Sequence, residues 1–471
     1  MRWGGIIPAP NPYRKRTWKL DQITISNAAA IRKTTIGTAI GNFTEWYDFG
    51  VYSYVVSYIA MSFFPGSSLA TLAAFAGLAI SFLIRPIGGI FWGMIGDRIG
   101  RRGVLATTVL LMAAGTFLVG VLPSYASIGW WAPILLFVLR GVQGFSTGGE
   151  YVGAITFLSE HAPDKLRGYL TSFLPVGTVS GYILGSALVI LMQVLLPDEA
   201  MASWGWRIPF LVALPIGAAG LYLRLGLDET PAYEKQDKSD SMENVSGWQQ
   251  VRDTVARHWP AILACGGLTI AFNVTNYMLT GYVPTYLTER IHVPGTPALV
   301  TVTAVMIVVV LLVTFVGRIG DKIGRRPILW VGCLAMIVVS APMFLLTARG
   351  DMAAIFFGTL PEGLMLVCFM ATVPSTLPAL FPTNARLGAT SIGFNIAVSA
   401  FGGTTPLIAA ALVEETGDLL MPGYILMAAG VIGAISVFYI RESSGKPMPG
   451  SGPNVSSKEE ALALVSSDGA T

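Results

Sequence analysis

The sequence contains one ten-residue motif twice, and each copy lies in a short basic gap between two long apolar runs. The first copy is GMIGDRIGRR (93–102) and the second is GRIGDKIGRR (317–326). Their aspartates, Asp97 and Asp321, are 224 positions apart (321 − 97), close to half of the 471 residues. A repeat of this length is too long for a solenoid unit and fits two related halves of several helices each.

The composition places these halves in a membrane. Apolar residues make up 53% of the chain and charged residues only 12%, whereas a soluble domain carries roughly 25% charged residues. Because a helical crossing needs about 20 apolar residues, the apolar runs predict an all-α membrane protein with twelve transmembrane helices in two pseudo-symmetric six-helix halves. The predicted spans are centred near residues 48, 82, 112, 145, 180, 216, 274, 307, 336, 365, 399 and 430.

Polar segments divide the chain and orient it. We expect an N-terminal arm (1–34), a first half (35–226), a linker (227–258), a second half (259–441) and a disordered tail (442–471). Most of the 30 Lys and Arg residues fall in the arm, linker, tail and motif-bearing gaps. Since such residues concentrate on the cytoplasmic side, both termini are predicted there, in a multi-pass protein of the cytoplasmic (inner) membrane. Because the arm is polar and basic, we do not expect it to be a cleavable signal peptide.

The repeated motif can close the cytoplasmic side. Its glycines let helix ends approach, its aspartate can accept hydrogen bonds from a neighbouring helix N-terminus, and its basic residues can pair with carboxylates. One copy alone would equally fit the basic bias of cytoplasmic loops, but two equivalent copies favour a gate. The predicted gate residues are Gly93, Asp97, Arg98, Gly100, Arg101, Arg102, Gly317, Asp321, Lys322, Gly324, Arg325 and Arg326.

Six ionisable side chains fall inside the predicted spans, where a charge costs roughly 2.5 kcal/mol or more at mid-bilayer. They are Glu45, Asp48, Arg85, Arg140, Glu150 and Glu362. We expect Glu362 to be a solvated charge at a helix end and the other five to form buried ion pairs that take part in proton coupling, because a moving arginine changes the proton affinity of a carboxylate. A permanently paired bridge that never titrates is the alternative for each acid.

Spacing predicts which of these side chains meet. Glu45 and Asp48 are three residues apart and share one helix face. Arg85 lies 12 residues before Asp97 (97 − 85), and Glu150 lies 10 residues before the next cytoplasmic boundary at position 160 (160 − 150). Both side chains therefore lie about 15 to 18 Å from the cytoplasmic boundary of their own span. This matching depth predicts an Arg85–Glu150 pair.

A substrate cavity is expected between the halves. Polar side chains recur at three- and four-residue spacing in span seven, and aromatic rings in spans one and seven suit a quaternary ammonium group. Aromatic residues also form ordinary membrane-interface belts. The predicted cavity residues are Trp46, Tyr52, Asn273, Asn276, Tyr277 and Thr280; Tyr282 and Tyr286 add further rings.

Several functional classes lack support in the sequence. Cys265, Cys333 and Cys368 are isolated in apolar runs, without the neighbours of a metal site or a disulfide framework. The chain contains no phosphate-binding GxxxxGK[ST] loop of an ATP-driven pump. No nucleophile constellation indicates an enzyme. We therefore expect no catalytic residues, cofactor, metal or nucleic-acid partner.

The repeated decapeptide resembles the signature of the major facilitator superfamily of secondary transporters: G, three residues, D, R or K, any residue, G, and two basic residues. GNFTEWYDFGVY, RGVQGFSTGGEY and NVTNYML more narrowly resemble the metabolite:proton symporter family and its bacterial proline/glycine betaine branch. In similar facilitators an acid of span one pairs with the arginine that opens the span-four motif. By motif position these are Asp48 and Arg140.

This resemblance implies proton-driven uptake of small zwitterionic osmolytes by alternating access across the lipid bilayer, with a monomer sufficient for transport. The same family contains carriers of 2-oxoglutarate, citrate and shikimate, so a proton symporter of an organic acid remains an alternative. A solute sensor that does not transport is a remote one. Composition and spacing alone do not indicate the substrate or the oligomeric state.

Overall fold

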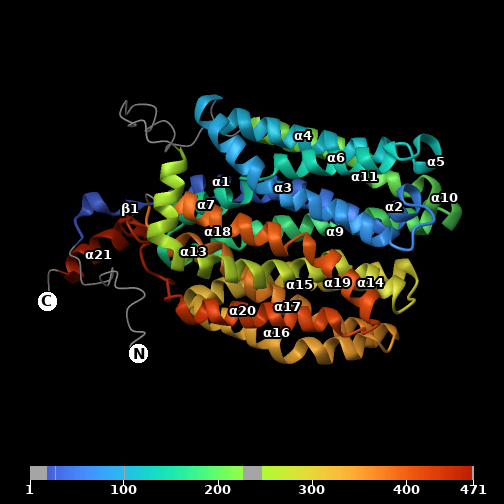
Figure 1. Ribbon diagram of the computed structural model, residues 1–471. Coiled ribbons are helices and arrows are strands. Elements are labelled where there is room, and N and C mark those ends of the chain that lie inside the picture. Colours follow the sequence, from blue (N-terminus) through green and yellow to red (C-terminus); the bar gives the residue numbers. More distant parts are fainter. Residues whose placement is uncertain (1–17, 27, 100, 226–246, 384, 469–471) are drawn as a thin grey trace.

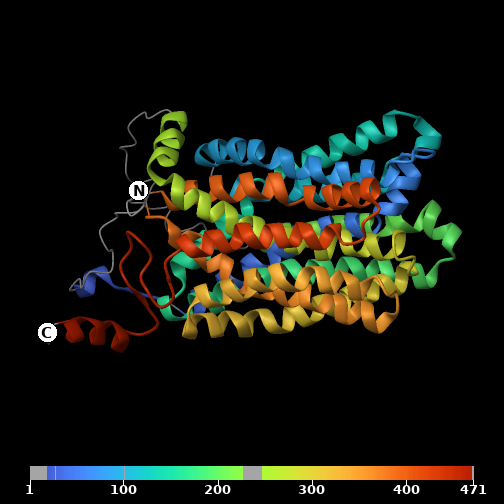
Figure 2. The ribbon, with the colours of Figure 1, turned by 60° about the horizontal axis from the view of Figure 1, so that its bottom comes forward.

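The computed structural model describes residues 18–26, 28–99, 101–225, 247–383 and 385–468. Long helices run side by side along the bundle, the blue-to-green first half beside the yellow-to-red second half (Figures 1 and 2). The N-terminal strand and the C-terminal helix lie together at one end. We call that end the terminal end and the opposite one the distal end.

The first half is entirely helical within the described residues. Its α-helices are α1 (Ala28–Tyr54), α2 (Val56–Phe63), α3 (Ala70–Ile99), α4 (Arg101–Val121), α5 (Tyr125–Ile128), α6 (Trp131–Ser146), α7 (Glu150–His161), α8 (Arg167–Thr171), α9 (Phe173–Leu195), α10 (Asp198–Ser203) and α11 (Ile208–Leu225). Short 3₁₀ turns lie at Asp164–Leu166 and Gly205–Arg207.

The second half repeats this arrangement. Its elements are α13 (Gly247–Tyr277), the π-helical turn η4 (Met278–Tyr282), α14 (Val283–Glu289), α15 (Gly295–Ile323), α16 (Arg325–Thr347), α17 (Met352–Thr376), a 3₁₀ turn (Pro378–Leu380), α18 (Arg386–Phe401), α19 (Thr404–Thr416) and α20 (Met421–Tyr439). The expected linker lies partly outside the described residues, and its last part, 247–258, is instead the start of α13.

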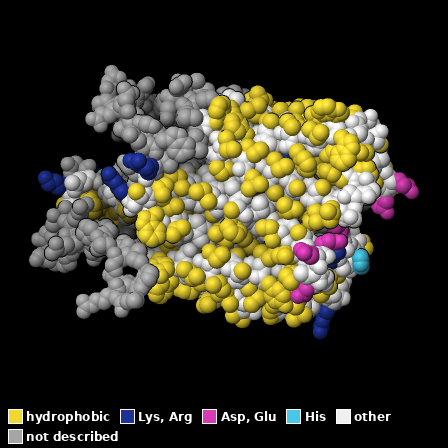
Figure 3. All heavy atoms as spheres, viewed as in Figure 1, with side chains coloured by type: hydrophobic (Ala, Val, Ile, Leu, Met, Phe, Trp, Pro, Cys, Tyr) yellow, Lys and Arg dark blue, Asp and Glu magenta, His cyan; other side chains and the backbone are white. Residues whose placement is uncertain are grey.

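Twelve helical columns cross the bundle within the described residues, which confirms the predicted fold. They are α1, α3, α4, α6 with α7, α9, α11, α13 with α14, α15, α16, α17, α18 with α19, and α20. Every predicted span centre lies in one of them. In the part of the chain that the structure describes, eight stretches are long and apolar enough to cross a membrane, and two shorter apolar helices accompany them. Hydrophobic side chains cover much of the visible flank, while Asp and Glu gather at the distal end (Figure 3).

Glycines on α3 and α6 bring two backbones into direct contact. A Cβ atom on Gly144 would lie 1.9 Å from the carbonyl oxygen of Ser81, and one on Gly88 would lie 1.9 Å from that of Phe145. Only glycine allows this approach. The Ser81 hydroxyl also donates to the Arg140 carbonyl oxygen at 2.9 Å. This contact fixes the height of α6 against α3, and so the position of Arg140.

The two halves meet along several helices. α9 of the first half packs against α15, and α3 packs against α18 and α19. Two of the columns at this interface are interrupted. Column seven contains η4, directly before Pro284, which has no N–H to continue an α-helical ladder, and column eleven breaks at Gly402 and Gly403.

The C-terminal tail is structured, contrary to the expected disorder. β2 (Asn454–Val455) pairs in parallel with β1 (Thr24–Ile25), beside the 3₁₀ turn Leu20–Gln22. It is followed by α21 (Lys458–Asp468). Ile23, Val455 and Ala461 form a small buried apolar cluster. Because this cluster forms only when both ends of the chain meet, the Ser/Gly/Pro-rich tail composition gave no local sign of it.

Candidate functional site: buried ion pairs and a terminal-end latch

Asp48 and Arg140 form an ion pair inside the first half. Asp48 Oδ2 lies 3.1 Å from Arg140 Nη1, and both side chains are at most 2% exposed. Asp48 Oδ1 also accepts hydrogen bonds from the Thr116 hydroxyl at 2.7 Å and from Gln143 Nε2 at 3.1 Å. The Arg140 guanidinium lies over the ring of Tyr52, 3.7 Å from its centroid. Donors from α4 and α6 therefore surround this carboxylate on α1.

The partner of Arg85 is Glu45. Arg85 Nη2 lies 2.6 Å from Glu45 Oε1, and both side chains are at most 3% exposed. Depth along the helices predicts Glu150 instead, and that prediction is wrong. The turn at 147–149 separates α6 from α7, so the rotation of Glu150 about its helix axis does not follow from counting residues.

Three carboxylates nevertheless meet around one small cavity. It has a volume of about 20 Å³ and is lined by Glu45, Asp48, Glu150, Thr44 and Thr116, among others. A cavity of this size, with several polar partners, has room for one water molecule. The side chains of Glu45, Asp48 and Glu150 thus line one water-sized space.

Aromatic rings connect the Glu45–Arg85 pair to the second half. The Arg85 guanidinium lies 4.5 Å from the ring centroid of Phe82 and 5.9 Å from that of Trp46. The ring of Tyr277, from α13, lies 4.9 Å from Phe82 and 5.9 Å from Trp46. Arg85 therefore lies one layer of rings away from the second half, whereas the Asp48–Arg140 pair is held entirely by helices of the first half.

The other predicted cavity residues have varied surroundings. Asn276 and Tyr277 are buried, and neither the Asn276 Oδ1 atom nor the Tyr277 hydroxyl has a hydrogen-bond partner among the described residues. Asn273 and Thr280 donate to backbone carbonyls of their own column. Tyr52 differs from expectation, because its hydroxyl donates to the Ala74 carbonyl oxygen and its ring packs on Arg140. It belongs to the Asp48–Arg140 cluster.

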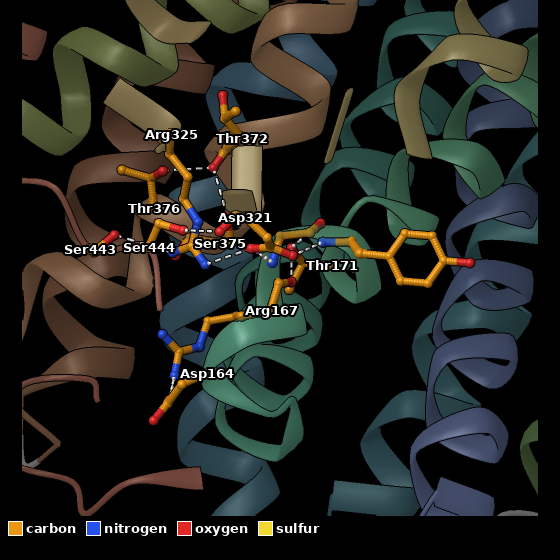
Figure 4. A network of polar contacts seen from close by, with 12 residues as sticks. Asp164, Arg167, Thr171, Asp321, Arg325, Thr372, Ser375, Thr376, Ser443 and Ser444 are labelled. Carbon is orange, nitrogen blue, oxygen red and sulfur yellow. Dashed lines mark hydrogen bonds and ion pairs between the residues drawn. The ribbon is translucent and has the colours of Figure 1, made fainter. Parts of the chain in front are cut away.

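At the terminal end, Asp321 joins the halves, as expected for this aspartate. Its two carboxylate oxygens accept the backbone N–H groups of Gly168 at 2.7 Å and Tyr169 at 2.8 Å. These groups belong to the start of α8 in the first half, where the helix dipole favours an anion. Arg325 lies 3.4 Å from Asp321 and also donates to the Ser375 carbonyl oxygen (Figure 4). We call these contacts the terminal-end latch.

The remaining motif residues of the second copy support this latch. A Cβ atom on Gly317 would lie 2.7 Å from the Ser172 hydroxyl, Gly324 has a positive φ of 104°, and Lys322 is exposed. Arg326 donates to the carbonyl oxygens of Val437 and Phe438. In the first copy, Gly93 lies in α3 and Gly100 lies outside the described residues. The side chains of Asp97, Arg98, Arg101 and Arg102 are also outside the described part of the structure.

Sequence reasoning missed the contribution of the tail to the latch. Glu442 accepts the backbone N–H groups of Arg325 at 3.1 Å and Arg326 at 2.9 Å, which are the first two residues of α16. Burial alone would raise the pKa of the Glu442 carboxyl. The hydrogen bonds from the N–H groups of Arg325, Arg326 and Ser444 lower it by more than burial raises it, so the pKa lies below its usual value. The position of Glu442 shortly after the last span was the only local sequence signal for this contact.

The tail also binds the first half. The backbone N–H of Asn454 donates to Asp164 Oδ2 at 3.0 Å, and Lys165 Nζ lies 2.7 Å from Glu460 Oε1. Arg386 of the second half pairs with Glu160 of the first at 2.7 Å and donates to the Pro449 carbonyl oxygen. The tail thus contacts both halves at the end where the latch lies.

Glu362 is buried, contrary to the expected solvated helix end. Its side chain lies in the interior of α17 with 0% exposure, and neither carboxylate oxygen has a hydrogen-bond partner among the described residues. The predicted span centre near residue 365, only three residues away (365 − 362), was the sequence signal that could have placed this acid deep in the bundle.

Comparison with known proteins supplies a family. The model of the Major Facilitator Superfamily matches residues 38–404. A proline/betaine transporter of Salmonella typhimurium is 41% identical over 95% of this chain and 90% of its own length. A glycine betaine/proline/ectoine/pipecolic acid transporter of Dickeya dadantii is also 41% identical, with the same coverage of both chains.

Solved structures show the same fold at lower sequence identity. The proton:xylose symporter XylE, bound to 6-bromo-6-deoxy-D-glucose, superposes with a TM-score of 0.72 over 93% of this chain and 99% of its own. Its sequence is 18% identical. At that identity the likeness concerns the arrangement of the helices only.

Proposed function

This chain belongs to the major facilitator superfamily of secondary transporters, and we propose that it carries small zwitterionic osmolytes such as proline and glycine betaine into the cell together with protons. The substrate class is supported by relatives named for these solutes along nearly the whole chain. We place the protein in the bacterial cytoplasmic membrane, with the basic terminal end in the cytoplasm.

The single observation that carries the proposal is the position of the Glu45–Arg85 pair beside the rings between the halves. A zwitterion there would direct its carboxylate to Arg85 and its cationic group to the faces of Trp46 and Tyr277. When Arg85 turns to the substrate, Glu45 loses its counter-charge and its proton affinity rises. Substrate and proton would then enter together.

The water-sized cavity supports the proton path. Glu45, Asp48 and Glu150 all line it, so a proton that reaches one carboxylate can pass to another through one water. Asp48 remains paired with Arg140, and in this proposal that pair mainly fixes α1 and α6. Glu150, which is half-buried, would exchange protons with the cytoplasmic side when the latch opens.

Alternating access follows from the contacts between the halves. The latch at Asp321 holds the cytoplasmic side closed, and its release would let the halves rock apart there. One copy of the chain contains both halves and both ion pairs, so a monomer suffices.

An organic-acid carrier fits these charges less well. Arg85 and Arg140 are both paired with carboxylates, and Glu150 adds a third acid nearby. Because Arg140 is held on Asp48 within the first half, at most Arg85 would be available to the two carboxylates of a dianion such as 2-oxoglutarate.

Uptake by proteoliposomes tests the proposal. Purified protein is given radiolabelled glycine betaine with and without an inward proton gradient, and with 2-oxoglutarate as competitor. We expect gradient-dependent accumulation that 2-oxoglutarate does not reduce. Protein that carries a carboxylate but no betaine would move the chain to the organic-acid branch, and betaine binding without transport would identify a sensor.

A further inference from the structure

A larger cavity, of about 220 Å³, lies at the distal end between the two halves. Its functional lining is Thr71 from α3, Tyr282 from η4, Tyr286 and Glu289 from α14, Arg290 and, from α19, Glu414. Glu289 follows Tyr277 by 12 residues (289 − 277), which is about 18 Å along a helix. The cavity is therefore separate from the Glu45–Arg85 site and lies on the opposite side from the latch.

The lining combines three kinds of group that suit a zwitterion. The rings of Tyr282 and Tyr286 are neighbours, with centroids 5.9 Å apart. Arg290 forms an ion pair with Glu414, and their side chains are 32% and 46% exposed. With Glu289, the lining carries two acids and one base. A net charge of −1 beside aromatic rings attracts a cationic group and repels a dianion.

Glu289 also links the halves at this end. Its Oε1 atom accepts hydrogen bonds from the hydroxyls of Ser57 at 2.9 Å and Thr71 at 3.1 Å, both in the first half. A cation that binds Glu289 competes with the hydroxyls of Ser57 and Thr71 for the same carboxylate. Occupation of the cavity and separation of the halves at the distal end are therefore linked.

We propose that this cavity is a loading site for a zwitterion on the outer side. Glu289 and the two tyrosine rings bind the cationic group of the zwitterion. The Arg290 guanidinium leaves Glu414 and pairs with the carboxylate of the zwitterion. The inference rests on the proposed uptake of zwitterions. The site captures the solute before it reaches the Glu45–Arg85 pair. A partly exposed arginine with an exposed partner can make that exchange, because such a pair is only weakly stabilised.

Uptake kinetics in intact cells test the site, since there the distal end has a single orientation. Glu289→Gln keeps an oxygen that accepts from Ser57 and Thr71 but removes the charge. We expect it to raise the KM for glycine betaine by about threefold to tenfold, with little change in maximal rate. External tetramethylammonium, which is a cation without a carboxylate, should inhibit wild-type uptake and have less effect on this variant.

Two controls separate binding from gating. Ser57→Ala, at a residue outside the cavity lining, removes one hydrogen bond between the halves and keeps the charge of Glu289, so its KM should stay near that of the wild type. Glu415→Gln removes the exposed acid that follows Glu414 in the sequence but does not line the cavity, and it should leave KM unchanged.

An unchanged KM in Glu289→Gln would overturn the site, and so would an equal rise in Ser57→Ala, because Glu289 would then act only by joining the two halves. Wild-type protein that carries no betaine would reject the proposed function itself, and this site with it.

Discussion

Glu45 on α1 and Arg85 on α3 are joined by a 2.6 Å ion pair that is at most 3% exposed and lies against the rings between the halves. Glu45→Gln keeps a hydrogen-bond acceptor for Arg85 and removes the group that titrates. We expect exchange of labelled betaine across proteoliposome membranes to continue, while accumulation driven by a proton gradient is lost. Glu199→Gln, an exposed acid at the distal end, is the control. If Glu45→Gln, Asp48→Asn and Glu150→Gln all accumulate betaine normally, the proposed proton path is wrong.

Asp48→Asn should mainly destabilise the protein. Arg140 is 0% exposed, and removing one partner of a buried pair costs about 3 to 5 kcal/mol. We expect a lower Tm and a lower yield of folded protein. The double variant Asp48→Asn with Arg140→Met removes both charges and should recover part of the loss. A single variant with the Tm of the wild type would contradict this.

Gly144→Ala tests the close contact between α3 and α6. Its methyl group would lie 1.9 Å from the Ser81 carbonyl oxygen, so the helices must separate and carry Arg140 with them. We expect a lower Tm and slower uptake. Gly153→Ala on α7 has no neighbour within 4 Å of the new methyl group and should leave both unchanged. Equal effects at the two glycines would show that packing against α3 is not the cause.

Asp321→Asn tests the terminal-end latch. An asparagine oxygen can accept one of the two N–H groups of Gly168 and Tyr169, but its NH₂ group cannot accept the other. We expect the variant to open more often at the terminal end. A Ser172→Cys thiol, placed beside Gly317, should then react faster with a membrane-impermeant reagent added on that side. Glu459→Gln, an exposed acid in α21, should leave the rate unchanged.

Acid should release the tail from α16. The pKa of Glu442 is lowered in the folded protein from its usual 4.5, so its contribution to the attachment is complete above about pH 4.5 and is lost as pH falls through the lowered value. Hydrogen exchange of residues 442–468 should therefore increase at acidic pH. Glu442→Gln should exchange faster already at neutral pH, with a smaller pH dependence. An unchanged acid profile in this variant would assign the effect to another group.

The number and order of the helices could be predicted from the sequence, because apolar runs long enough to cross a membrane leave one choice of secondary structure. The Asp321 contact was predictable from the duplicated motif. The pairing of Asp48 with Arg140 followed from a resemblance, since spacing within α1 places Glu45 and Asp48 on one face without choosing between two arginines.

Other contacts depend on geometry that no local pattern contains. Arg85 pairs with Glu45 because the turn between α6 and α7 changes the direction of Glu150. Glu289 and Arg290 line the distal cavity after a π-helical turn in column seven, which the expectation of a regular α-helical span does not include. Glu442 and the tail bind residues more than a hundred positions earlier in the chain.

The pairing of Thr24 with Asn454 sets an order on biosynthesis. These residues are 430 positions apart (454 − 24), so at about 5 to 20 residues per second the first strand waits roughly 20 to 90 s for its partner to leave the ribosome. By then every membrane helix has been synthesised. The two-stranded sheet is thus among the last elements to form, and its presence marks a chain whose membrane helices have all been synthesised.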